Sequence, residues 1–278
     1  MGLRKIPVES MRTNGRSCVA IVATILAVLL VSYAANGQEP PTPTNVASPC
    51  LEPPPMIRWG DYQGPFPKTV AALTGRLERR SVPSPHYKPG TVLCSLELGD
   101  KFILFAQDSV DPLSFLSAGF NAGLDQAGNK YPSFGQGAAG YGKRFGANFL
   151  NQTSHSFFTQ FAYPAIFRED PRYYRLAHGS VKSRLLHAAG HAFVAHRDNG
   201  KRMFNISEWL GTSSAVWLSN TYYAGGPRGF GPEARQIGYA VLQDVGWDVL
   251  REFWPEIAHK LKMPFRDRRE PATSLPPE

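Results

Sequence analysis

Two histidines four residues apart have the spacing of a metal site. We predict that His187 and His191 lie on one helix, which would place both imidazoles on the same face, as a two-ligand metal clamp requires. The helical motif of zinc hydrolases carries a glutamate directly after its first histidine, and here that position is Ala188. A catalytic zinc would need a third ligand, for which His155 and Glu208 are the candidates. Because the sequence offers no identifiable general base, a metal-dependent hydrolase is the alternative function and not the main one.

The densest cluster of charged and aromatic residues spans residues 168–175. Two interpretations are open: the arginines form internal ion pairs, or the segment binds an anionic group such as a lipid phosphate, since guanidinium groups bind phosphate and tyrosines suit a membrane interface. Residues 168–202 hold eight basic and three acidic residues, a net charge of +5. The residues predicted to contact the anion are Arg168, Arg172, Tyr173, Tyr174 and Arg175.

Two cysteines remain once the N-terminal segment is set aside. Cys50 and Cys94 can form a disulfide in an oxidising compartment, which would tie the N-terminal part of the chain to its main body. Two free buried thiols are the other interpretation. Their wide separation and the lack of a nearby histidine pair argue against a zinc ribbon.

The N-terminus has the three parts of a secretory signal. A basic stretch reaches Arg16, an apolar run covers residues 18–31, and small residues follow at Ala34, Ala35 and Gly37. We predict that residues 1–37 are a signal peptide or, alternatively, an N-terminal membrane anchor, because the uncharged stretch is long enough to span a bilayer. The chain is therefore expected to be exported to the periplasm or the membrane-associated cell envelope of a bacterium.

Composition is compatible with a packed core and indicates no nucleic acid partner. The 278 residues are 42% hydrophobic, and the formal net charge is +8. Without residues 1–37 the chain has 26 basic and 21 acidic residues, and a charge of +5 is too mild to indicate binding to nucleic acid.

Prolines mark the remaining segments. Residues 38–95 are proline-rich and are predicted to form an extended arm with one short helix over 68–79. Residues 96–262 are expected to form the helical domain, and 263–278 a flexible tail.

Helix signals recur between these flanks. We predict helices over 113–127, 138–163, 181–196 and 232–261, and another that begins at Asn205, whose Glu208 completes a capping-box-like start. Asp111, which precedes Pro112, is predicted to cap the first of these helices. Small residues four apart are predicted to let helix backbones approach closely. The pairs and triplets with this spacing are Ala118 and Ala122; Gly119 and Gly123; Gly142 and Gly146; and Gly211, Ala215 and Ser219.

These features predict a mainly α fold, a single helical bundle domain that follows the signal or anchor segment and the proline-rich arm. An outer-membrane β-barrel is the alternative, because aromatic residues, glycines and low charge also suit barrel strands. The helix caps and the long amphipathic stretch near the C-terminus favour helices.

Four motifs resemble an uncharacterised family of exported bacterial proteins. They are GQGAAGYGKRFGA at 135–147, EDPRYY at 169–174, NISEWLG at 205–211 and EFWP at 252–255, and the resemblance covers about residues 101–261. The family pattern has an aspartate where this chain has Glu256. The resemblance implies export and one helical domain, and it carries no activity, ligand or catalytic residue.

The sequence thus predicts a non-enzymatic envelope protein that contacts a membrane surface or an envelope component through the segment around Arg172. No cofactor is expected in this interpretation, whereas the hydrolase alternative requires zinc. The substrate or ligand, the oligomeric state and the membrane contacted stay open.

Overall fold

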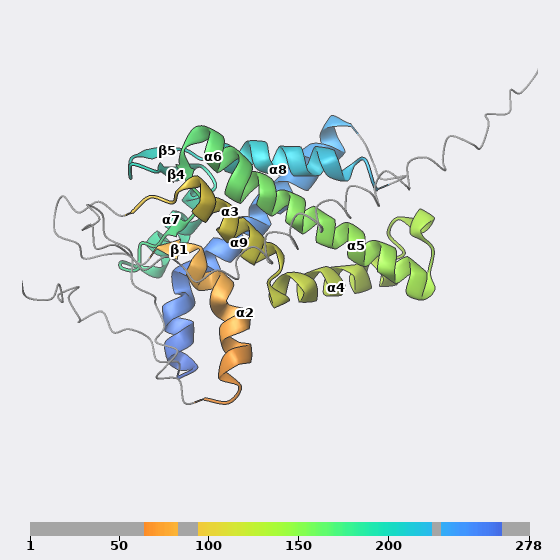
Figure 1. Ribbon diagram of the computed structural model, residues 1–278, viewed down its shortest axis with the longest axis horizontal. Coiled ribbons are helices and arrows are strands. Elements are labelled where there is room, and N and C mark those ends of the chain that lie inside the picture. The colour runs from red at the N-terminus through yellow and green to blue at the C-terminus, as the bar shows by residue number, and fades with distance from the viewer. Residues whose placement is uncertain (1–63, 83–93, 224–228, 263–278) are drawn as a thin grey trace, which may run out of the picture. The chain divides into compact units, whose positions relative to one another are not determined.

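The computed structural model describes residues 64–82, 94–223 and 229–262 (Figure 1). The prediction of a mainly α fold is confirmed for these residues, whose strands form only two small, open sheets. Segments 1–37 and 263–278 lie outside them. The elements are α2 (Pro67–Arg79), β1 (Ser81–Val82), α3 (Leu98–Ser109), α4 (Pro112–Ala127), η3 (Pro132–Phe134), α5 (Gly137–Ser156), η4 (Phe157–Ala162), α6 (Tyr163–Phe167), β2 (Glu169–Asp170), β3 (Tyr173–Tyr174), α7 (Val181–Gly190), β4 (Val194–Arg197), β5 (Arg202–Phe204), α8 (Ile206–Ser219) and α9 (Phe230–Lys260).

Local capping explains where several helices begin. Asp111 accepts a hydrogen bond from the backbone N–H of Leu113 at the start of α4, and Asn205 accepts one from Glu208 at the start of α8, as predicted. The short helix predicted in the arm is α2. The prediction missed α3, although Glu97 and Asp100 form the reciprocal capping box that opens it.

The helix predicted over 181–196 is wrong in its second half. α7 ends at Gly190, and β4 then pairs antiparallel with both β2 and β5. The turn-forming residues 198–200 connect β4 to β5 as a hairpin, so long-range strand pairing overrides the local helical pattern. β1 and β3 form the second sheet, which is parallel.

The helix predicted over 138–163 continues beyond its predicted end. Pro164 does not stop the chain of helical turns; instead α5 widens into the π-helical segment η4, and α6 follows directly. Proline has no N–H to donate and crowds the preceding turn, so a widened turn just before it relieves the conflict.

The small-residue stripes have different outcomes. Ala118 and Ala122 of α4 are fully buried, and α4 lies along α5 (Figure 1). At Gly211 of α8, an added Cβ would lie 2.7 Å from the Thr159 side chain in η4, so the backbones are in close contact there. Gly142 and Gly146 face open space within the described part of the chain, so the prediction of a contact stripe on α5 is wrong.

The apolar core of the described residues lies where α2 meets α9. Leu77, Trp254 and Ala258 are buried there, with Val70 and Leu250 packed around them. α2 therefore packs against the helical body, although the sequence assigned it to the arm. The domain limits at 38–95 and 96–262 as a whole stay predictions.

The long helix α9 does not divide into the apolar and polar faces that the sequence predicts. Leu242 is exposed, and the buried positions include both apolar and charged residues: Val241, Asp248, Arg251, Glu252, Trp254 and Ala258. The buried charges have partners elsewhere in the fold, which a periodicity in the sequence does not reveal.

Candidate functional site

The predicted anion-binding segment makes internal ion pairs in the structure. Arg172 is buried and donates to the Asp170 carboxylate from Nε, 3.0 Å from Oδ1 and 3.2 Å from Oδ2, and from Nη2, 2.7 Å from Oδ2. Tyr174 donates its hydroxyl to the same carboxylate at 2.8 Å. Arg168 follows the last residue of α6, has a left-handed backbone conformation, and is exposed. Binding of an outside anion stays a prediction, with Arg168 the most accessible of its five residues.

Glu252 of α9 holds the other half of this segment. It accepts hydrogen bonds from the Tyr173 hydroxyl at 3.0 Å and from Arg184 Nε at 2.9 Å, and its backbone carbonyl accepts one from Arg175. Burial, and then Glu252, raises the pKa of Tyr173 far above its ordinary value. The EDPRYY and EFWP motifs therefore meet in a buried contact that holds the fold together.

The two histidines predicted to bind metal have separate partners. His187 Nε2 lies 2.8 Å from the backbone oxygen of Tyr174, and His191 Nδ1 lies 2.7 Å from Asp248 Oδ2. Both rings contact Tyr173. The described residues bring neither His155 nor Glu208 to this pair in a three-ligand group. Metal binding by His187 and His191 stays a prediction.

Cys94 is disulfide-bonded, and its backbone oxygen accepts a hydrogen bond from Arg172. Cys50 lies outside the described residues, so its pairing with Cys94 stays a prediction.

A group of charged side chains is buried between α2, α3 and α9. Asp108 of α3 is fully buried; Arg79 Nη2 lies 3.0 Å from its Oδ1, and Arg76 and Arg80 lie 3.7 and 3.9 Å from its Oδ2. Arg79 also binds Asp111 at 2.6 Å. Burial lowers the pKa of Arg80, which Arg251 lowers further. Such a cluster is stable only while both signs of charge are present.

The group continues along α9. Asp248 binds His191 and, through Oδ1, Arg251 at 2.5 Å. Burial raises the pKa of Asp248, but the pull of His191, Arg251 and Arg80 outweighs it, and the net shift is downward.

One turn earlier on α9, three potential metal ligands converge. His155 lies in the last turn of α5, Glu208 in the first turn of α8, and Asp244 in α9. Their ligand atoms are all within 4.8 Å of one another. His155 Nε2 is 3.2 Å from Asp244 Oδ2 and 3.1 Å from the hydroxyl of Thr212. Burial, followed by the charges of Asp244 and Asp248, raises the pKa of Glu208 well above its ordinary range.

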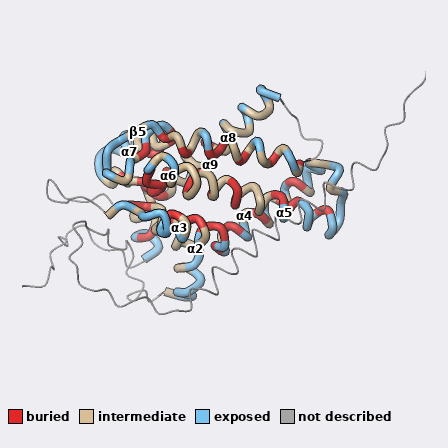
Figure 2. The backbone as a smooth tube through the Cα atoms, turned by 45° about the horizontal axis from the view of Figure 1, so that its top comes forward, coloured by how far each residue is buried: buried red, intermediate tan, exposed pale blue. Residues whose placement is uncertain are grey.

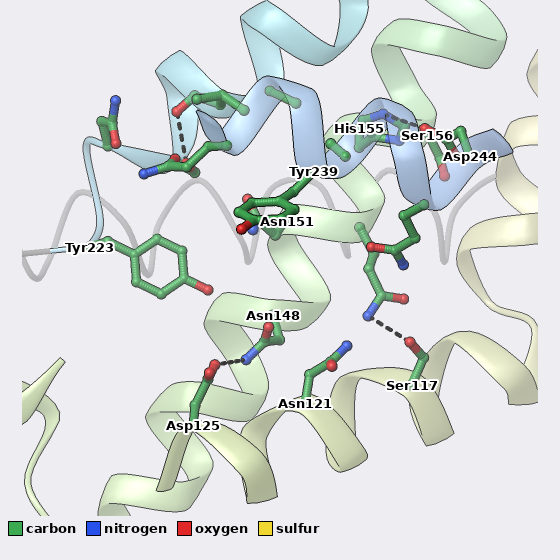
Figure 3. Close-up of a pocket in the computed structure, with 18 of the residues that line it drawn as sticks. Ser117, Asn121, Asp125, Asn148, Asn151, His155, Ser156, Tyr223, Tyr239 and Asp244 are labelled. Atoms are coloured by element: carbon green, nitrogen blue, oxygen red, sulfur yellow. Dashed lines mark hydrogen bonds and ion pairs between the residues drawn. The ribbon is translucent and has the colours of Figure 1, made fainter. Parts of the chain in front are cut away.

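A polar cavity of about 390 Å³ opens beside this group (Figure 3). His155 and Asp244 form part of its wall, and much of the rest is amide, hydroxyl and phenol. Asn148 donates to Asp125 at 3.0 Å and Gln152 donates to Ser117 at 3.3 Å within it. Other lining residues are Asn121, Asn151, Ser156, Ser219, Tyr223, Gln236, Tyr239 and Gln243.

The outer faces of two helices that border the cavity are apolar. On α4 the buried positions are Ser114, Ala118, Ala122 and Asp125, and on α8 they are small or hydroxylic as well. Figure 2 shows buried and exposed stretches alternating along these helices. The large exposed side chains are Phe115, Leu116, Phe120 and Leu124 on α4, and Leu210 and Trp217 on α8.

No family model matches the chain, and no curated protein or solved structure matches it either. Among residues 64–82, 94–223 and 229–262, no helix is both long enough and apolar enough to cross a membrane.

Sequence reasoning nominated His155 and Glu208 but missed Asp244 and Asp108. Asp244 lies on the side of its helix that the sequence predicts to be polar, where a solvated position is the ordinary expectation. A usable signal was its spacing: Asp244, Asp248 and Arg251 lie on successive turns of one helix face, close to Glu252.

Proposed function

We propose that this chain is an exported, non-enzymatic envelope protein that adheres to a membrane through the apolar outer faces of α4 and α8. The observation that carries the proposal is the distribution of side chains on these helices. Phe120 is 69% exposed on α4 and Trp217 is 70% exposed on α8, while Ala118 and Thr212 are fully buried. In water, hydrophobic burial favours the opposite arrangement.

Charge supports the same interpretation. The only charged residue in α4 is Asp125, which is buried, and the only one in α8 is Glu208, which faces the interior cluster. Each outer face is therefore free of ionised groups that would have to be taken out of water on contact with lipid. Exposed apolar faces of this kind are typical of a surface that contacts a membrane or another protein.

The helix lengths favour adhesion over crossing. α4 has 16 residues and α8 has 14. At about 1.5 Å per residue these are shorter than the roughly 30 Å hydrocarbon core of a bilayer. A helix of this length can lie in the interface with its apolar face among the acyl chains.

Fluorescence quenching by brominated phospholipids tests the proposal, because bromine quenches only tryptophans close to the acyl chains. With the full chain in neutral phosphatidylcholine vesicles, we expect quenching that falls markedly in Trp217→Phe. Trp254→Phe is the matched control, since Trp254 is buried between α2 and α9 and its removal should leave the quenched signal in place.

Two results would reject this proposal. One is quenching that is unchanged in Trp217→Phe. The other is binding that needs anionic lipid, weakens with salt and is lost in Arg168→Gln, which would instead support adhesion through the basic segment.

A further inference from the structure

We propose that His155, Glu208 and Asp244 bind one divalent metal ion at the inner wall of the polar cavity. The three side chains come from α5, α8 and α9, and each has one ligand atom within 4.8 Å of the others. One imidazole nitrogen and two carboxylate oxygens form a donor set that suits Zn²⁺. This inference concerns the interior of the molecule and does not depend on the membrane proposal.

A second observation points to a cation at this position. Glu208 Oε1 is shielded from solvent and has no hydrogen-bond donor among the described residues. Leaving a buried carboxylate oxygen without a donor is unfavourable, so buried acidic groups are normally paired or coordinate a metal. Asp244 places a second carboxylate beside Glu208. The two negative charges repel each other unless a proton or a metal ion lies between them.

The charges around the group permit a cation. The acidic side chains that face it or its immediate neighbours are Glu208, Asp244, Asp248 and Asp108, and the basic ones are Arg76, Arg80 and Arg251. Arg79 and Asp111 pair with each other at the edge. His155 and His191 also contact these carboxylates. With the carboxylates ionised and both imidazoles uncharged, the cluster has one negative charge in excess, which a divalent ion can neutralise.

Coordination requires a small closure of the three side chains. Ligands at about 2.1 Å from a tetrahedral zinc lie about 3.4 Å apart, so no pair of ligand atoms needs to approach by more than about 1.4 Å. His155 Nε2 is already 3.2 Å from Asp244 Oδ2. His155 and Asp244 line the cavity and Glu208 does not (Figure 3), so the remaining coordination position faces the cavity, where water or a polar ligand can occupy it.

Titration of the untagged full chain with Zn²⁺, after treatment with chelator, tests the inference by calorimetry. We expect one Zn²⁺ per chain, and at least a 100-fold loss of affinity in both His155→Ala and Glu208→Gln. His187→Ala is the control, because His187 lies in the other predicted metal pair and contacts the backbone of Tyr174. The affinity of the His187→Ala variant for Zn²⁺ should stay within about threefold of that of the unaltered chain.

X-ray absorption of the unaltered, Zn²⁺-loaded chain gives a readout that does not depend on the folding of a variant. We expect a first shell with one imidazole and otherwise oxygen. Two imidazoles, or a loss of binding in His187→Ala, would assign the ion to His187 and His191 and overturn the inference. Absence of stoichiometric Zn²⁺, or unchanged affinity in Glu208→Gln, would overturn it as well, and the latter would indicate that a shared proton holds Glu208 and Asp244 together.

Discussion

Two parts of this molecule bury opposite kinds of side chain. Where α2 meets α9, Leu77, Trp254 and Ala258 form an apolar core. In α4 and α8, small and polar side chains face inward, and the largest apolar ones, such as Phe120, face outward. The first arrangement follows from burial driven by water, and the second is expected where the surroundings are themselves apolar. Helix amphipathicity alone therefore does not define the interior of this fold.

The largest expected effect comes from truncating one large apolar side chain in each of the two regions and comparing the free energies of unfolding. Trp254→Ala should lower the free energy of unfolding by about 3–5 kcal/mol, because it empties the core between α2 and α9. Phe120→Ala should change it by no more than about 0.5 kcal/mol in detergent, because its side chain is 69% exposed. Urea unfolding of both variants in the same detergent measures the difference. Equal losses would mean that α4 buries its outer face against something in the folded chain, and would remove the contrast.

A second test compares alanine substitutions at two helical glycines, one in α8 and one in α5. Gly211→Ala should destabilise the chain by about 1–3 kcal/mol, since the new methyl group would press on Thr159 and on the backbone of η4. Gly146→Ala should stabilise it by up to about 1 kcal/mol, because the site is open and alanine favours a helix. Thermal unfolding followed by circular dichroism measures both. A loss of stability in Gly146→Ala would show that α5 makes a close contact at that face.

The smallest expected effect concerns His196 in the hairpin of β4 and β5, and tests whether this imidazole is buried as the polar side chains of the interior are. Burial, followed by His191 and Arg202, lowers the pKa of His196 to about 4. A histidine whose pKa is lowered in the folded state stabilises the fold above its unfolded pKa of about 6.5, and that stability is lost as the pH falls toward 4.

We therefore expect stability to fall by about 1–2 kcal/mol between pH 7 and pH 4 through this group. His196→Gln should flatten that part of the pH profile of the unfolding free energy. His259→Gln is the control, since His259 is exposed near the end of α9. An unchanged profile in His196→Gln would place the ring in a solvated site.

The parts of the fold that sequence could predict are those decided by near neighbours. The caps at Asp111 and Asn205 depend on bonds to residues two and three positions ahead, and both predictions are confirmed. The end of α7 depends on pairing of β4 with β2 and β5, which lie elsewhere in the chain, and local pattern missed it.

The same limit applies to the candidate site. His155 and Glu208 could be nominated by residue type, but only the folded chain brings them to Asp244. Arg172 illustrates the converse. Its carboxylate partner, Asp170, is two residues away, and the ion-pair interpretation was already available from that short spacing.

The π-helical segment η4 determines how the two ends of a long helical run are rotated about their common axis. It lies between His155 and Arg168, and its wider turn takes up one residue more than an α-helical turn does. The extra residue is therefore absorbed without the rotation of about 100° that one added residue would give in α5. Pro164 and β2 thus keep nearly the orientation that a continuous α-helix one residue shorter would give them.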